Sequence, residues 1–337
     1  MKRRFSTVLT TAVIAMVVVL HRPTSADEPD HQATAPSQAV SKAVDQAIPY
    51  LQRAGETWIE KRQCVSCHQV PFMLWSLSAA ASNGHEIDSA QLRKWESWST
   101  EIASFEKPER KQDLVPDATM AANIDTMNGL LLGISTKDSS RESDARDWRS
   151  QFTTALTSNQ STDGGWKACG QLPAQKRPAE ETGQVTTIWT LLALAKHGVA
   201  AEDPAAAESF IENASPVSTE WWAARLLLAD QRNDQETGML RSKLLHLQQD
   251  DGGWGWLTDD PSDALATGLA LYAIALTRPT VDSNSNAINA AQQFLLSTQK
   301  PDGSWAVPGT KKATRKKSTP TANYWGTAWA VIGLLES

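Results

Sequence analysis

The segment that decides the fold is "LQQDDGGW" (residues 247–254), which recurs in related form as "SNQSTDGGW" (158–166) and "STQKPDGSW" (297–305). Each copy closes a helix with Gln or Ser, turns on Asp-Gly and ends in Trp, and such self-similarity is typical of repeat architectures. Glycine tolerates the positive φ of a tight turn, a Trp ring can cover the junction between stacked hairpins, and Gln can bond exposed carbonyls at a helix end. The three turns therefore predict repeated helix hairpins.

Each turn is followed by a second, more apolar helix, and less regular copies of the same unit fill the rest of the chain. Strand signals are nearly absent. We expect six hairpins whose second helices form an inner ring, an all-α (α/α)6 toroid that is a single domain over residues 43–337. The expected pairs are 43–61 with 69–82, 88–106 with 117–134, 142–160 with 185–198, 204–213 with 217–230, 235–250 with 262–276, and 285–299 with 321–336.

These turns resemble the "QW" repeats of the squalene–hopene cyclase and prenyltransferase group, clearly over 142–336 and more weakly over 43–134. The resemblance implies an α/α toroid, but the turn marks the fold more than a reaction. Cyclases of that group use a catalytic Asp-x-Asp-Asp, from which Asp259-Asp260-Pro-Ser-Asp263 departs. No Asp/Cys/His set matches the zinc site of prenyltransferases. Cys169-Gly-Gln171 is one residue shorter than the Cys-x-x-Gln of toroids that form internal thioesters.

The first hairpin carries a different motif, Cys64-Val-Ser-Cys67-His68, in the connection that the Asp-Gly turn occupies elsewhere. Cys-x-x-Cys-His in an exported chain is typical of covalent haem c, with two thioether-forming thiols and the next imidazole as proximal iron ligand. The motif predicts haem attachment at Cys64 and Cys67, with His68 on the iron. A Cys64–Cys67 disulfide and a zinc site stay as alternatives.

The sixth iron ligand depends on which groups share the mouth of the ring with the haem. If all inner helices run the same way, Met120 begins the second inner helix at that mouth, and it is our first choice as a metal ligand. Met127, a His or an open iron are the alternatives.

The function expected from this motif is electron transfer or haem-dependent redox chemistry, with a redox partner protein. The alternative is a terpenoid cyclase or prenyltransferase-like enzyme, or a toroid that binds an apolar or sugar ligand in its central cavity. Whether the chain is an enzyme stays open, and no catalytic residue is predicted, since the carboxylates on inner helices look isolated. Those carboxylates are Asp125, Glu220 and Asp263, and the Trp residues expected on inner helices are Trp189, Trp221, Trp222, Trp325 and Trp329.

The N-terminus predicts export. Three basic residues precede the apolar run 8–20, which is too short to span a bilayer and is followed by small residues, so residues 1–26 are expected to be a cleaved signal peptide. Residues 27–42 are expected to be a flexible leader. We therefore expect a periplasmic or otherwise exported protein with no stable membrane insertion after cleavage.

The charge balance of the chain is acidic. The net charge is −6, and loss of residues 1–26 would leave 28 basic against 38 acidic residues, a net charge of −10. Nucleic acid is therefore not expected as a partner.

Two long loops are expected at the mouth of the ring. Loop 167–184 holds Cys169, either a buried thiol or a reactive or ligand thiol. Loop 306–320 gathers Lys311, Lys312, Arg315, Lys316 and Lys317. This second loop is expected to be a solvated lid, or to pair with haem propionates or an acidic redox partner.

Overall fold

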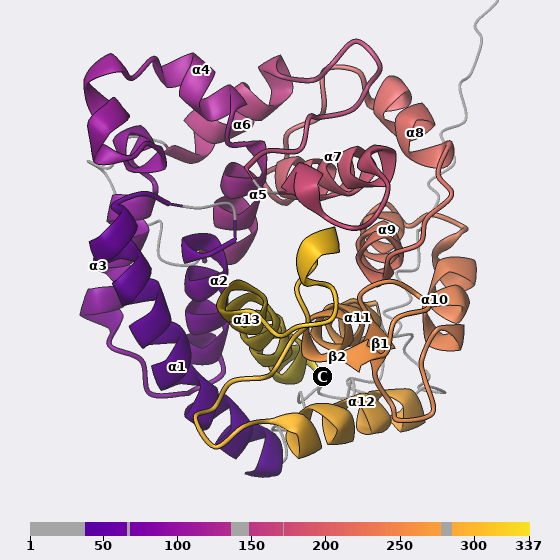
Figure 1. Ribbon diagram of the computed structural model, residues 1–337. Helices are drawn as coiled ribbons and strands as arrows, with labels where there is room; N and C mark the ends of the chain where they lie inside the picture. Colours follow the sequence, from indigo (N-terminus) through magenta and orange to yellow (C-terminus); the bar gives the residue numbers. More distant parts are fainter. Residues whose placement is uncertain (1–37, 66–67, 136–147, 171, 278–284) are drawn as a thin grey trace, which may run out of the picture. The chain divides into compact units, whose positions relative to one another are not determined.

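The computed structural model describes residues 38–65, 68–135, 148–170, 172–277 and 285–337, and its centre is a closed ring of six helices (Figure 1). Each of these inner helices packs on the next one along the chain, and the last returns to the first. The inner helices are α2 (Val70–Ser82), α5 (Ile124–Gly133), α7 (Ala179–Lys196), α9 (Thr219–Gln231), α11 (Ala264–Leu276) and α13 (Pro320–Glu336).

A second layer of helices surrounds the ring. Helix α1 packs on α2, on α13 and on α12, so the first and the last outer helix of the chain are in contact. The outer helices are α1 (Gln38–Arg62), α3 (Ser89–Ser99), α6 (Trp148–Ser158), α8 (Pro204–Glu212), α10 (Thr237–His246) and α12 (Ser285–Thr298), and the short helix α4 (Pro116–Ala121) leads into the inner helix α5. Short 3₁₀ turns are η1 (Ile102–Phe105), η2 (Pro108–Asp113), η4 (Leu172–Ala174) and η5 (Lys312–Thr314). The predicted all-α (α/α)6 toroid is confirmed.

Several boundaries differ from the sequence-based expectation, among them the end of α3, which lies at Ser99 rather than at residue 106. Helix α1 begins at Gln38, inside the segment predicted as a leader, because Val40 and Ala43 are buried against the rest of the structure. The second inner helix is broken between α4 and α5, where the Asn123 side chain donates to the Thr119 carbonyl at 2.8 Å. Helix α7 begins at Ala179, six residues before the predicted start, so it takes in part of the long loop before it.

The strands in the described residues form one two-stranded sheet, β1 (Trp254–Gly255) and β2 (Ser262–Asp263). They pair antiparallel, with Trp254 opposite Asp263. Asp263 then caps α11, since its carboxylate accepts from the backbone N–H groups of Leu265 and Ala266, both at 2.9 Å. The sheet therefore ties the repeated turn to the start of its inner helix.

The Trp of each repeated turn joins the two helices of its own hairpin. Its indole N–H donates to a carbonyl of the preceding outer helix at 2.7–2.8 Å, and its backbone N–H donates to a Thr hydroxyl of the following inner helix at 2.9–3.2 Å. All three rings are 1% exposed. The trios are Trp166 with Leu156 and Thr187, Trp254 with Leu244 and Thr267, and Trp305 with Leu295 and Thr327.

The Gln of each turn joins one repeat to the next. Its side-chain amide donates both to the carbonyl of the turn Gly and to a carbonyl at the start of the following outer helix or its cap. The acceptors in the next repeat lie at 2.8 Å and are Asp203 for Gln160, Ala287 for Gln248 and Ala43 for Gln299. Gln299 thus bonds the last repeat to the first helix, which closes the ring.

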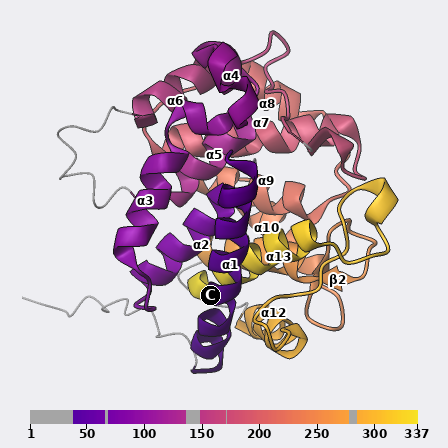
Figure 2. The ribbon, with the colours of Figure 1, turned by 60° about the vertical axis from the view of Figure 1, so that its left-hand side comes forward.

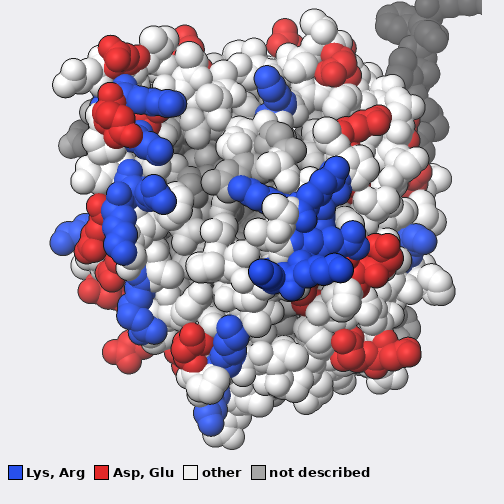
Figure 3. Space-filling view, viewed as in Figure 1, with Lys and Arg blue, Asp and Glu red and all other residues white. Residues whose placement is uncertain are grey.

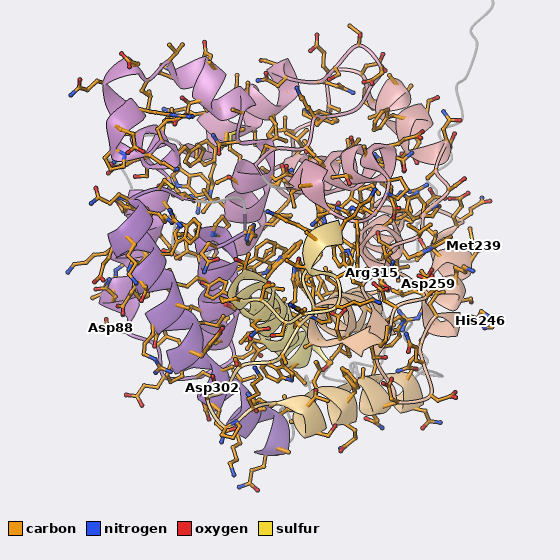
Figure 4. The ribbon with its side chains drawn as sticks, in the orientation of Figure 1. Asp88, Met239, His246, Asp259, Asp302 and Arg315 are labelled. Carbon is orange, nitrogen blue, oxygen red and sulfur yellow. The ribbon has the colours of Figure 1, made fainter. Side chains whose placement is uncertain are left out.

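The turn glycine allows this contact because it has no side chain. Gly303 has φ +83°, and a Cβ there would lie 1.9 Å from the carbonyl oxygen of Gln46 in α1. Figure 4 shows the neighbouring Asp302 where the chain leaving α12 passes α1. Gly164 and Gly252 make the equivalent close approaches to α8 and α12.

Helices α11 and α13 approach more closely than the other inner pairs. A Cβ on Gly268 would lie 2.4 Å from the Trp329 backbone, and one on Gly333 would lie 2.5 Å from the Gly268 carbonyl oxygen. Glycines on both helices therefore set the spacing on this side of the ring.

None of the described helices combines the length and the apolar character needed to cross a membrane.

We expect Gly303→Ala to destabilise the protein far more than Gly84→Ala. Both glycines have nearly the same positive φ, +83° and +85°, but nothing lies within 4 Å of a Cβ on Gly84. The left-handed backbone should cost about 1–2 kcal/mol in both variants, and the clash with Gln46 should raise the total for Gly303→Ala to about 3 kcal/mol or more. Urea unfolding followed by circular dichroism measures both losses. Equal losses of stability in the two variants would contradict the close backbone contact between the last and the first repeat.

Candidate functional site

The ring encloses a cavity of about 40 Å³, set within about 470 Å³ of space that is not filled by atoms and is partly open to solvent. Helices α2, α5, α7, α9 and α13 supply its wall together with the segments that precede α2 and α7. The polar side chains in the wall are His68, Asp125, Asn128, Arg177, Thr186 and Glu220, and the aromatic ones are Phe72, Trp75, Trp189 and Trp325.

The charged groups of the cavity come from the starts of inner helices. Asp125 and Glu220 are the second residues of α5 and α9, and His68 and Arg177 each lie two residues before the first residue of α2 and α7. Because these four helix starts line one cavity, the four helices point the same way. Carboxylates are favoured there, since the N-terminal end of a helix carries a partial positive charge and unpaired N–H groups.

Asp125 is fully buried in this wall. Its carboxyl oxygens accept from the Cys169 backbone N–H and from the Thr186 hydroxyl, both at 2.8 Å, and the Cys169 thiol also bonds to it. Burial raises the pKa of Asp125, the three hydrogen bonds oppose that rise, and the negative charge of Glu220 adds to it. No Lys or Arg of the described residues forms an ion pair with this carboxyl. Burial therefore shifts the Asp125 carboxyl toward its proton-bearing form.

Glu220 differs from Asp125 because it is held in a buried ion pair. Its carboxylate accepts from the Arg177 guanidinium at 2.8 Å and from the Trp189 indole N–H at 3.2 Å. The Arg177 guanidinium also lies over the Trp256 ring, 5.2 Å from its centroid. Both partners of this ion pair are buried, so each charge depends on the other.

The aromatic residues form one continuous cluster around the cavity. The Phe72 and Trp75 rings stack with an interplanar angle of 10° and a centroid distance of 5.8 Å. Trp329, which is 1% exposed, contacts both rings and Trp189 at 5.2–5.8 Å. The cavity thus has a rigid aromatic wall.

Two polar atoms of residues in the wall have no hydrogen-bond partner among the described residues. The Asn128 amide donates to Thr190 at 2.8 Å, but its Oδ1 finds no hydrogen-bond partner among the described residues. The Trp325 indole N–H likewise has no hydrogen-bond partner among the described residues. Buried polar atoms of this kind are uncommon in proteins and identify places where a bound molecule would complete the bonding.

His68 belongs to this cavity too. It is buried, and its ring centroid lies 5.5 Å from that of Trp325. Burial first, and the nearby Lys311 charge second, lower the pKa of His68 to about 4. The imidazole is therefore neutral at physiological pH.

The other predicted haem-site residues do not join His68 in the cavity wall. Cys64 is buried, its carbonyl accepts from the Trp58 indole at 2.9 Å, and burial raises the pKa of its thiol. Met120 is buried in a separate depression between α4 and α6. Cys67 lies outside the described residues, so haem attachment at Cys64 and Cys67 stays a prediction.

The sequence analysis missed the central feature of the site, because it compared carboxylates only along single helices. Asp125 and Glu220 look isolated in sequence, yet the ring brings them into one cavity. Arg177, Asn128 and Thr186 were not singled out at all. The position of both acids in the first turn of an inner helix was the signal that could have identified them.

Only some of the aromatic and acidic residues that were expected on inner helices line the cavity. Trp189 and Trp325 line the cavity, and Trp329 packs beneath it. Trp221 and Trp222 are not in the cavity wall, and Trp222 faces Lys243. Asp263 serves as the helix cap described above.

Neither a model of a known protein family nor a curated protein matches the sequence. Solved structures do match across most of their length. A possible member of the GH105 family from Salmonella enterica is 14% identical, with a TM-score of 0.52, and the match covers 92% of this chain and 96% of that one. A polysaccharide lyase is 10% identical, with a TM-score of 0.54 and coverages of 88% and 96%. The type II terpene cyclase from Scytonema, bound to geranylgeranyl dihydroxybenzoate, is 14% identical, with a TM-score of 0.51 and coverages of 88% and 97%. The chain therefore shares a cyclase-like α/α toroid with these proteins.

These findings correct the predicted function. The expectation of haem-dependent redox chemistry or electron transfer is wrong: the similar solved structures are those of a GH105-type protein, a lyase and a cyclase, and no group of three or more His, Cys, Asp or Glu that could hold a metal occurs in the described ranges. The five-residue motif suggested an iron ligand, whereas the fold places His68 against Trp325 as a neutral part of the cavity wall. The alternative, an enzyme or ligand-binding toroid that uses its central cavity, fits better.

We expect Arg177→Met to lower the free energy of unfolding by about 3–5 kcal/mol, because it leaves the Glu220 carboxylate buried without its counter-charge. The double variant Arg177→Met/Glu220→Gln should recover most of this loss, since it removes both charges. Urea unfolding of the wild type, both single variants and the double variant gives the coupling. A double variant no more stable than Arg177→Met would contradict the buried ion pair.

Proposed function

We propose that this chain is a carbohydrate-active enzyme that binds its substrate in the central cavity and uses Asp125 as the general acid. The observation that carries the proposal is the environment of Asp125, a buried carboxyl in the cavity wall that has hydrogen-bond donors and, among the described residues, no Lys or Arg ion-paired with it. A carboxylic acid can serve as a proton donor near neutral pH only when its surroundings raise its pKa.

Glu220 has the complementary role. Arg177 and Trp189 occupy both of its oxygens, so the carboxylate is held in place and is poorly suited to accept a proton. Its negative charge raises the pKa of Asp125 and would stabilise positive charge that develops on a substrate after protonation. Two carboxyls in one cavity, one with a raised pKa and the other paired with a cation, are the pattern expected of acid-assisted cleavage at a sugar ring.

The cavity wall favours a sugar as the ligand. Flat aromatic faces can stack on a sugar ring, while the partnerless Asn128 Oδ1 and Trp325 N–H offer an acceptor and a donor for hydroxyl groups. Similarity in fold to a possible GH105 member and a polysaccharide lyase supports this choice. The reaction we propose is hydrolysis of a glycosidic bond: Asp125 donates its proton to the leaving oxygen as the bond to the anomeric carbon breaks, and a water molecule adds its oxygen to that carbon and returns a proton to Asp125.

A second candidate is cyclisation of a terpenoid, which the aromatic wall favours because aromatic faces stabilise positive charge on a bound ligand. The turns that resemble the QW repeats, and the similarity in fold to the Scytonema terpene cyclase, support it. In that reaction the same Asp125 proton would add to a carbon–carbon double bond. The buried Arg177–Glu220 pair and the partnerless polar atoms argue for the sugar ligand instead.

We expect the wild-type protein to release reducing ends from one member of a panel of oligosaccharides, and Asp125→Asn to lower that rate by at least about 100-fold, as removal of a general acid does. The activity should fall as the pH rises through the raised pKa of Asp125, since only the protonated form donates. Reducing-sugar assays across a pH series measure both effects.

The matched control is Asp250→Asn, which makes the same change at an exposed carboxylate and should keep wild-type activity. The same proteins are incubated with geranylgeranyl diphosphate. Turnover of this compound alone, dependent on Asp125, would replace the first proposal with the second. Sugar release that Asp125→Asn leaves unchanged would refute the role of Asp125.

A further inference from the structure

The basic loop, residues 306–320, stands over the end of the ring where the cavity lies. Figure 1 shows it crossing the centre of the view between the inner helices, and Figure 2 shows it standing out at the right-hand side, at the end of the ring that faces the reader in Figure 1. Lys311 is close enough to His68, in the cavity wall, for its charge to lower the pKa of that imidazole. The loop is therefore part of the surroundings of the cavity mouth.

The backbone of the basic loop is held in a defined shape. Gly309 N–H donates to the Lys317 carbonyl at 3.0 Å, and a Cβ on Gly309 would lie 2.0 Å from the Thr314 hydroxyl. The loop is also bonded to the segment before α7, since Lys176 N–H donates to the Thr310 carbonyl at 2.7 Å. Its lysines are thus presented by an ordered turn around η5.

The buried carboxylate of Asp260, which lies shortly before α11, holds the loop against the ring. The Arg315 guanidinium donates to Asp260 at 2.6 Å, and Lys176 is ion-paired with the same carboxylate. These two cations hold the pKa of Asp260 below its usual value against the opposing effect of burial. Figure 4 shows Arg315 and the neighbouring Asp259 on this side of the structure.

The remaining cations of the loop are not paired with any acidic residue in the part of the chain that the structure describes. No ion pair is found, among the described residues, for Lys311, Lys312, Lys316 or Lys317, and the last three are exposed. The chain as a whole has a net charge of −6, so this concentration of positive charge is local. Figure 3 shows the blue side chains gathered over the place where the loop crosses the ring. Like charges held together on an ordered turn repel one another and attract a partner of opposite charge.

We propose that the basic loop is a docking surface for an acidic polysaccharide, whose end enters the central cavity. The identity of the polymer rests on the proposed function, because the cavity behind the loop is suited to a sugar ring. The several lysines match a partner with regularly repeated charges, such as the carboxylates or sulfates of a glycan chain. The cavity's own cation, Arg177, is already paired with Glu220, so the loop lysines are the groups left to hold those anions.

The test compares Lys312→Glu/Lys316→Glu/Lys317→Glu with the wild type, using fluorescently labelled polygalacturonate and heparin at low and high salt. We expect the wild type to bind at least one of these polymers, more weakly as salt is added, and the variant to bind it at least tenfold more weakly. The substituted side chains are exposed, so the fold should be kept, as near-ultraviolet circular dichroism will show.

The control is Lys61→Glu/Arg93→Glu/Lys94→Glu, which makes the same change in net charge on exposed residues of α1 and α3. It should bind like the wild type. Equal loss in both variants, no binding of either polymer by the wild type, or tighter binding of duplex DNA or of an acidic protein would overturn the proposal.

Asp125→Asn separates this proposal from the proposed function. Its polymer binding should equal that of the wild type while its catalysis is lost. Docking that depends on the loop lysines in a protein without glycosidase activity would support the docking surface and refute the catalytic role. If the wild type does not bind the polymers and the loop variant keeps its activity on neutral oligosaccharides, the catalytic role is supported and the docking surface is refuted.

Discussion

The contact on which the rest of the structure depends is the approach of each repeated turn to the next outer helix. The Gln amide spans the turn and the following repeat at 2.8 Å, and the turn Gly lets the two backbones touch. A single hairpin of this kind has an apolar inner helix that it cannot bury alone, so each repeat depends on its neighbours. The contact between Gln299 and Ala43 differs from the others only in sequence separation, and it turns a row of hairpins into a closed ring.

Closure of the ring creates the chemistry of the site. Because inner helices point the same way, groups from four separate helix starts meet in the wall of one cavity. A carboxyl that is buried there is stabilised by a cation or by hydrogen-bond donors. Glu220 is paired with Arg177, whereas the Asp125 carboxyl has hydrogen-bond donors among the described residues and its pKa is raised, mainly by burial. The difference between the two acids comes from their neighbours, since both occupy the same position in their helices.

The fold was predicted well and the function was not, and one reason explains both: each sequence signal reports on contacts over a limited distance along the chain. The repeated turns predicted the ring because each one forms bonds inside its own hairpin and with the next hairpin. The residues of the repeated pattern are therefore the residues that make the packing contacts. The Cys64 to His68 motif is a signal of five residues whose meaning depends on what surrounds it. In the structure His68 is packed beside Trp325 in a wall that also holds Asp125 and Glu220. A local motif does not report such neighbours, because they come from helices far apart in the chain.

The sequence by itself determined the helix class, the three strong turns, five of the six hairpin pairings without interruption, and the concentration of lysines in residues 306–320, because each of these depends on residues close together in the chain. It did not determine the break between α4 and α5 or the early start of α7, which follow from bonds such as that between Asn123 and Thr119 and from packing of the neighbouring loop. Only the tertiary structure brought Asp125, Arg177 and Glu220 together, and only it put one acid beside a cation and the other beside Cys169 and Thr186. Protonation state and binding geometry are properties of the space that residues share, and that space exists only once the ring has closed.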